Sequence, residues 1–290
     1  MPAKEFRPVD RHLDGIDHLI IGVRDLEAAR ARYARLGFNT TPRGRHVGWG
    51  TANYCVMFAD DYLELLGIVD PAGFTNNLDR LLEERGEGLL GVALGSRDAA
   101  GTHAAWAAAG LAPAAPRALG RLLEADGAPL DLRFRNVMLG TDATAGVSLF
   151  ACQHLTPDLL RRPAWLAHPN GARRIRSCTI VADDPGPVAD AMAKVFGSAA
   201  ITSTDNVLAV HTGRGVILIA PPADADLMHP AVAVPETAPE PRLCVLSVEV
   251  ADPQRAFSFL ALQGVVFHRT AEGALIPPDQ AHGVALELVR

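Results

Sequence analysis

The chain repeats one short pattern four times along its 290 residues. Each copy opens with an apolar run, continues through an aspartate and a stretch of helical character, and reaches a glycine 12 or 13 residues after the aspartate. The aspartate and glycine of the four copies are Asp25 and Gly37, Asp98 and Gly110, Asp184 and Gly197, and Asp252 and Gly264. An aspartate can accept hydrogen bonds from the free N–H groups that begin a helix, and glycine adopts the left-handed conformation that often ends one. The pattern therefore predicts four strand–helix junctions of one kind.

Further strand-like runs follow each glycine and complete the repeating unit. They cover residues 39–45, 50–58, 62–68, 130–139, 147–152, 207–212, 216–220, 274–277 and 284–289. Each copy thus has the order strand, helix and three strands, and its short helix needs a sheet to cover its apolar face. We predict an α+β fold of four βαβββ units, paired into two domains with curved, mostly antiparallel sheets.

The connecting segments place the predicted domain boundaries. The first domain covers residues 14–153, a linker covers 154–173, and the second domain covers 174–290. The linker contains His168-Pro169-Asn170-Gly171, which we interpret as a turn that fixes the joint between the domains. Residues 76–85 predict an extra helix between the first two units.

Composition excludes several classes of partner. The formal net charge is −6 and no basic run stands out, so nucleic acid and anionic membrane surfaces are not expected partners. No apolar stretch approaches the roughly 18 residues that span a bilayer, and the N-terminus lacks an apolar signal core. The four cysteines lie far apart in apolar runs, as expected of buried free thiols in a cytoplasmic protein.

Two polar residues interrupt apolar strands of the first unit. His18 lies in the run Gly15–Val23, and Glu64 lies in the run Tyr62–Gly67. Burying a polar group without a partner costs several kcal/mol, so we expect the two side chains to meet.

The repeat resembles the vicinal oxygen chelate superfamily, which includes glyoxalase I, extradiol dioxygenases and bleomycin-binding proteins. The bacterial glyoxalase-like domain proteins are the most similar group. The residues that carry the resemblance are Asp17-His18-Leu19, Gly44 to Asn53, Tyr62 to Leu65, Cys152-Gln153-His154, Thr156-Pro157, and Trp165 with His168 to Ala172. The resemblance covers nearly the whole chain and is specific for the fold, whereas one fold can support many reactions.

The resemblance implies a cup that holds a divalent metal, with ligands on the first and last strands of a unit. His18 and Glu64 match those positions, and Fe, Mn, Zn, Ni or Co would suit them. The second unit has Gly91 and Phe150 at the corresponding places, so it supplies no standard ligand. We consider His154 the third ligand, with His46 and Cys152 as alternatives. A metal-free cup with a hydrogen-bonded His18–Glu64 pair is an equal alternative.

The second half offers a weaker site. Glu287 matches Glu64, but no histidine stands beside it in the sequence, so we expect that site to be lost.

Several other residues are candidates for binding a small-molecule substrate. His46 and Asn53 are candidates to face the predicted cup. Asn53 could orient a substrate carbonyl, and a core or edge role for Asn53 is an equal alternative. Arg133 and Arg135 share one face of a strand, so they form a carboxylate or phosphate clamp if that face points inward. An outward, solvated face is the alternative.

We expect a glyoxalase-like enzyme that acts on a small oxygenated substrate by lyase, isomerase or dioxygenase chemistry. His18 and Glu64 would be its catalytic residues. The alternative is a non-catalytic protein that sequesters a small molecule, as bleomycin-resistance proteins do. A homodimer is the expected assembly.

Overall fold

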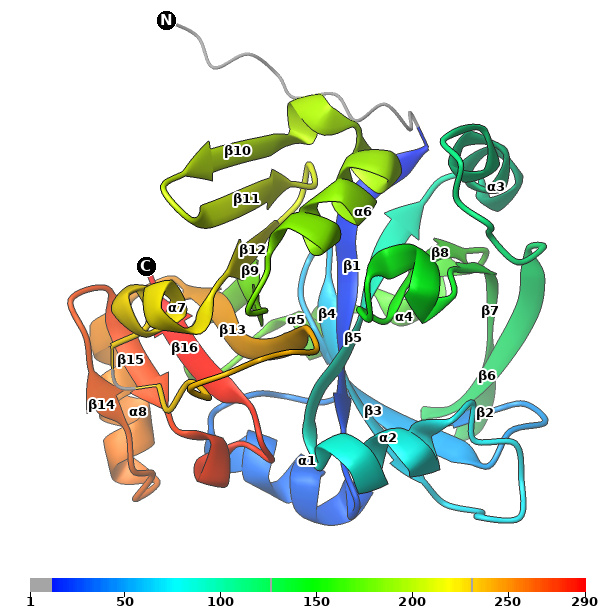
Figure 1. Ribbon diagram of the computed structural model, residues 1–290. Helices are drawn as coiled ribbons and strands as arrows, with labels where there is room; N and C mark the ends of the chain where they lie inside the picture. Colours follow the sequence, from blue (N-terminus) through cyan, green and yellow to red (C-terminus); the bar gives the residue numbers. More distant parts are fainter. Residues whose placement is uncertain (1–11, 126, 231) are drawn as a thin grey trace, which may run out of the picture.

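The computed structural model describes residues 12–125, 127–230 and 232–290, which form two eight-stranded mixed sheets (Figure 1). The first half folds into a closed barrel with strand order β1-β4-β3-β2-β6-β7-β8-β5. The second half forms an open sheet with order β10-β11-β12-β9-β13-β16-β15-β14. The chain is therefore an α+β protein, and its barrel encloses the residues predicted for the cup.

The elements follow the predicted order strand, helix and three strands in each of the four units. The first unit contains β1 (Leu13–Gly22), α1 (Leu26–Arg35), β2 (Gly44–His46), β3 (Thr51–Met57) and β4 (Tyr62–Ile68). The second contains β5 (Gly88–Ser96), α3 (Ala99–Ala108), β6 (Arg117–Ala125), β7 (Ala128–Met138) and β8 (Leu149–His154). The third contains β9 (Ala172–Val181), α6 (Gly186–Phe196), β10 (Ile201–Thr204), β11 (Val207–His211) and β12 (Val216–Ala220). The fourth contains β13 (Arg242–Val250), α8 (Pro253–Leu262), β14 (His268–Arg269), β15 (Gly273–Ile276) and β16 (Ala285–Val289).

Shorter elements connect the units. The predicted helix between the first two units is α2 (Leu78–Arg85). The segment after the barrel contains α4 (Pro157–Leu160) and α5 (Pro163–Leu166), and α7 (Pro222–Met228) follows β12. None of the helices in the described ranges is long and apolar enough to cross a membrane.

The predicted helix boundaries have the expected chemistry. The side chains of Asp25, Asp98 and Asp252 accept hydrogen bonds from backbone N–H groups in the first turns of α1, α3 and α8. Asp184 accepts from Gly186 N at 3.0 Å, although Pro185 is the residue that immediately precedes α6. The four glycines that follow the helices all have positive φ, between 63° and 88°.

A β-bulge recurs in the first strand of every unit. One residue is left without a partner at Asp17, Leu90, Arg176 and Cys244, where the pairing register of β1 with β5 and of β9 with β13 shifts by one. Each of these four residues stands eight positions before the aspartate of its unit, as the pairs Asp17 and Asp25 or Leu90 and Asp98 illustrate. Further register shifts occur at Asp14 in β1 and Arg173 in β9. The bulge is therefore part of the repeat, and it alters the direction of side chains at the start of each unit.

The turn before β9 joins the two halves. His168 Nδ1 accepts a hydrogen bond from Asn39 N at 3.0 Å, and its Nε2–H donates to Met57 O at 2.9 Å. Asn170 Nδ2 donates to Leu36 O at 3.0 Å, and its Oδ1 accepts from Ala172 N. These contacts agree with the predicted structural role of residues 168–171.

Candidate functional site

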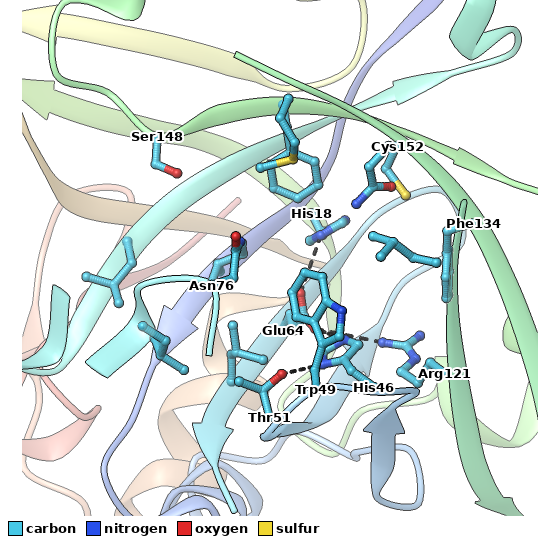
Figure 2. A pocket seen from close by; sticks show the side chains of 18 of the residues that line it. His18, His46, Trp49, Thr51, Glu64, Asn76, Arg121, Phe134, Ser148 and Cys152 are labelled. Atoms are coloured by element: carbon cyan, nitrogen blue, oxygen red, sulfur yellow. Dashed lines mark hydrogen bonds and ion pairs between the residues drawn. The ribbon is translucent and has the colours of Figure 1, made fainter. Parts of the chain in front are cut away.

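The barrel encloses a cavity of about 160 Å³, and its lining includes residues of α2 and β6. Its wall is largely apolar and includes residues from all eight strands of the barrel. The apolar lining side chains include Ile20, Trp49, Leu66, Leu78, Leu81, Leu90, Leu119, Phe134, Met138 and Phe150. The titratable side chains among them are His18, His46, Tyr62, Glu64, Arg117, Arg121 and Cys152. Figure 2 shows His18, His46, Glu64 and Arg121 pointing toward one another within this cavity.

The bulge at Asp17 brings two successive side chains of β1 together. In a regular strand, neighbouring side chains point to opposite faces of the sheet. Here His18 Nδ1 donates to Asp17 Oδ2 at 2.7 Å, and the same oxygen accepts a hydrogen bond from His154 Nε2 at 2.8 Å. Because Asp17 is an acceptor for both rings, it fixes Nδ1 of His18 as the protonated nitrogen and directs Nε2 into the cavity.

His18 meets Glu64 as expected from the sequence. Their closest atoms, His18 Nε2 and Glu64 Oε2, lie 3.4 Å apart, and both side chains are almost fully buried. The Tyr62 ring stacks on the imidazole of His18, with ring centroids 4.3 Å apart, and the Phe150 ring contacts its edge. The imidazole is thus held between two aromatic rings and two carboxylates.

Three other polar side chains surround the Glu64 carboxylate. Asn53 Nδ2 donates a short hydrogen bond to Glu64 Oε1. His46 Nε2 and Arg121 Nη1 lie 3.6 and 3.9 Å from the same oxygen. Burial alone would raise the pKa of Glu64, but His18, His46, Arg121 and the Asn53 hydrogen bond outweigh that effect and lower it. Glu64 is therefore a carboxylate at neutral pH.

His46 completes this side of the cavity as a neutral imidazole. Its Nδ1 lies 2.8 Å from Thr51 Oγ1, and its ring lies against that of Trp49. Burial lowers the pKa of His46 to about 4, although the charge of Glu64 opposes that shift.

The structure brings four of the seven predicted site residues together. It places Arg133, Arg135 and His154 outside that group. His18, Glu64 and His46 line the cavity, and Asn53 supports Glu64. The clamp interpretation of Arg133 and Arg135 is wrong, because both side chains are exposed on the outer face of β7. Arg133 pairs there with Asp131 at 2.7 Å, while the alternate residues Leu132 and Phe134 point inward.

Arg121 is the arginine inside the barrel, and sequence reasoning missed it. It lies on β6, a strand that was not predicted, where Arg117, Leu119, Arg121 and Leu123 alternate along one face. That alternation was the available signal, and the weak strand propensity of Gly120 and the flanking prolines concealed it.

The predicted metal set of His18, Glu64 and His154 does not form. His154 bonds to Asp17 and does not line the cavity. Within the described residues, one group of three potential ligands has its atoms within 4.8 Å of one another: Asp17, Cys152 and His154. His46 does not complete such a group with His18 and Glu64, and the Arg121 guanidinium lies close to Glu64, where it would oppose a second cation.

Asp17, Cys152 and His154 could hold a metal ion, but their present chemistry does not fit one well. The Asp17 oxygen already accepts two hydrogen bonds. Burial and the nearby Asp17 charge raise the pKa of the Cys152 thiol well above its ordinary value, whereas metals bind the thiolate. We therefore derive no chemical step through a metal.

The open sheet contains a related arrangement that the sequence did not predict. His229, which follows α7, lies beside Glu287, with Nδ1 and Oε1 2.9 Å apart. Ser247 Oγ donates to Glu287 Oε2 at 2.7 Å, and His229 Nε2 lies 2.9 Å from Thr179 Oγ1. The expectation that Glu287 has no histidine beside it is thus wrong, because the histidine comes from a connecting segment 58 residues away.

Comparisons with known proteins agree with this architecture. The family model for the glyoxalase-like domain matches residues 16–196. None of the curated proteins compared with the chain is detectably similar to it in sequence. One similar solved structure is a hypothetical protein from Staphylococcus aureus, with a TM-score of 0.61 and 11% identity over 82% of this chain and 91% of that one.

Two other similar structures have enzyme names. A variant of 4-hydroxymandelate synthase from Streptomyces coelicolor has a TM-score of 0.57 and 15% identity over 89% of this chain and 77% of that one. A xylose isomerase-like TIM barrel/4-hydroxyphenylpyruvate dioxygenase fusion protein has a TM-score of 0.55 and 16% identity over 92% of this chain and 41% of that one. At such identities the likeness establishes a shared fold only.

Proposed function

Because the chain belongs to the glyoxalase-like domain family, we propose that it is an enzyme that moves a proton next to a carbonyl group of a small substrate. The substrate would bind in the barrel cavity. The observation that carries this proposal is the ionised Glu64 carboxylate, which lies in an apolar cavity within 4 Å of His18, His46 and Arg121.

Glu64 is the general base in this proposal. A proton on the carbon beside a carbonyl moves to the Glu64 carboxylate, and the electron pair of the broken C–H bond becomes an enolate. A buried positive group near the enolate oxygen stabilises it more strongly than water would. Arg121 supplies that charge, and return of the proton to the same or a neighbouring carbon completes an isomerisation.

The lowered pKa keeps Glu64 ionised before substrate binds, as a general base requires. Glu64 can therefore accept a proton from the substrate without first losing one of its own.

The second candidate is a sequestration protein that uses the same cavity without chemistry. The apolar wall of Phe150, Trp49 and several leucines supports it, since such a surface binds small molecules regardless of reaction. Proton exchange distinguishes this candidate from the enzyme.

The test measures hydrogen–deuterium exchange in D₂O by proton NMR, with 4-phenyl-2-butanone and phenylpyruvate as probes. We expect the wild-type chain to accelerate loss of the protons beside the carbonyl of at least one probe. Glu64→Gln keeps the shape of the side chain and removes the base, so it should slow exchange at least about 100-fold.

Arg45→Met serves as the control, because Arg45 is exposed on β2 and lies outside the cavity lining. It should exchange as the wild type does. Binding of either probe without any Glu64-dependent exchange would support the sequestration protein and overturn the enzyme.

A further inference from the structure

Arg121 is fully enclosed in the barrel, yet the two nitrogens that carry three of its five N–H donors have no partner among the described residues. The side chain is 2% exposed. Its Nη1 donates to Cys55 Sγ at 3.3 Å and faces Glu64 at 3.9 Å. Within the described chain, no protein group accepts a hydrogen bond from Nε or Nη2. A buried donor without a partner destabilises a protein, and more so when the donor is charged.

The two unused atoms form one edge of the guanidinium group. Nε and Nη2 donate in parallel directions, and this fork matches the two oxygens of a carboxylate. The opposite edge, through Nη1, faces Glu64 and Cys55. A ligand carboxylate can therefore bind Arg121 without displacing Glu64.

The neighbouring residues hold the guanidinium in this position. Its carbon lies 5.2 Å from the centre of the Phe134 ring, as in a cation–π contact. The stem of Arg121 passes over Gly44 on β2, where a Cβ would lie only 2.7 Å from Arg121 Cδ. The arginine is thus rigidly placed in the cavity wall (Figure 2).

The remainder of the cavity defines the rest of the ligand. The apolar side chains that line the same cavity as Arg121 include Phe134, Phe150, Leu119 and Trp49. The cavity volume of about 160 Å³ is close to that of an engineered 150 Å³ cavity that binds benzene. A compact apolar group about the size of one aromatic ring fits this space.

We infer that Arg121 is a carboxylate-binding residue and that the cavity accepts monocarboxylates with a compact apolar body. This inference rests on the proposed function and names its substrate class.

The test compares phenylacetate with phenylacetamide, which have nearly the same shape and differ in charge. Dissociation constants are measured by isothermal titration calorimetry at pH 7 for the wild type, Arg121→Met, Arg121→Lys and the control Arg45→Met. We expect the wild type and Arg45→Met to bind the acid at least tenfold more tightly than the amide. Arg121→Met should reduce this ratio to about one, and Arg121→Lys should restore part of it because it keeps the charge without the fork.

Two outcomes would overturn the inference: equal affinity of the wild type for acid and amide, or an unchanged ratio in Arg121→Met. Circular dichroism shows whether Arg121→Met folds. If it does not, the ratio of amide to acid dissociation constants in the wild type and in Arg121→Lys still tests whether Arg121 binds the carboxylate. Glu64→Gln separates the two proposals, since it should lose exchange while keeping the preference for the acid. Exchange of the neutral ketone without any preference for the acid would leave the proposed function standing and remove only the inference.

Discussion

At the scale of single residues, the Asp17 carboxylate connects the cavity with His154. Its Oδ2 accepts hydrogen bonds from the rings of His18 and His154, and Arg161 Nη2 lies 3.7 Å from Oδ1. Burial would raise the pKa of Asp17, but both histidines lower it strongly, so the group remains ionised. Asp17 is therefore a positioning residue for His18 and through it for Glu64.

Asp17→Asn should weaken the Glu64-dependent proton exchange by about 10- to 100-fold, because it replaces charged hydrogen bonds that are worth about 1.5–3 kcal/mol. The rate should fall more than the affinity for the probes, since Asp17 does not line the cavity. Nitrogen-15 NMR of the imidazoles provides a second readout: the protonated nitrogen of His18 should no longer be fixed as Nδ1. An unchanged His18 signal together with a slower reaction would contradict this role.

Cys152 allows a test of whether Asp17, Cys152 and His154 bind a metal ion. Because its thiol has a raised pKa, Co²⁺ added at pH 7 should give no thiolate-to-cobalt charge-transfer absorption. The measurement is near-ultraviolet absorption of the wild type, with Cys152→Ser as the comparison. A band that appears in the wild type and disappears in Cys152→Ser would establish Asp17, Cys152 and His154 as a metal site.

At the scale of helices and strands, the sequence predicts the features that depend on a few neighbouring residues. The aspartates and glycines around the four helices could be read from the sequence because capping and positive φ depend on single residue types. The strands β6, β10 and β14 could not be predicted. β10 and β14 have only four and two residues, and a glycine interrupts the nine-residue β6, so each carries little pattern. Their pairing depends on neighbours that are remote in the sequence.

The same distinction explains which parts of the site could be predicted. His18 and Glu64 stand out because each is a polar residue in an apolar run. Arg121 and His229 do not, since only the closed barrel and the return of the α7 segment give them buried partners. The outward direction of Arg133 required knowledge of which face of β7 is inside.

The β3–β4 turn provides a pH-dependent contact between the barrel and the second half. Asp61 Oδ1 accepts a hydrogen bond from Ile175 N on β9 at 3.0 Å. Burial raises the pKa of Asp61 to about 7, although this bond and Arg214 oppose the shift. The folded protein thus holds a proton that the unfolded chain loses near pH 4, so this contribution to stability is present at low pH and is lost as pH rises to about 7.

Asp61→Asn keeps an oxygen that can accept from Ile175 and removes the titration. Compared with this variant, the wild type should lose up to about 4 kcal/mol of unfolding free energy between pH 4 and pH 7. Urea unfolding of both proteins at intervals of half a pH unit measures the difference. A constant difference across that window would show that Asp61 titrates normally.

At the scale of the whole molecule, the two sheets share one hydrophobic core. The largest cluster of buried residues runs from Leu13 in the barrel to Leu288 in the open sheet. Backbone hydrogen bonds such as Ile16 N to Arg214 O, at 2.9 Å, also cross between the halves. We therefore propose that the two predicted domains unfold as one cooperative unit.

The three tryptophans make this proposal easy to test. Trp49, Trp106 and Trp165 all lie before β9, so tryptophan fluorescence reports on the first half, whereas far-ultraviolet circular dichroism reports on both. Thermal unfolding should give coincident transitions by the two methods. Leu288→Ala, which removes a buried side chain of β16, should cost about 2–5 kcal/mol and lower both transitions equally. If Leu288→Ala had the same fluorescence transition temperature as the wild type, the two domains would unfold independently.

The recurrent bulge makes the chain a scaffold on which an active site can be relocated. Four strands carry the same one-residue insertion, but only the first has the sequence Asp-His at that position. On β13 the corresponding residues are Cys244 and Val245, and Glu287 already stands on the neighbouring strand β16, as Glu64 does on β4. Two substitutions there would introduce an Asp-His pair beside a carboxylate that His229 and Ser247 already contact. The repeat thus gives this protein a second strand pair with the same backbone geometry, which is a starting point for protein design.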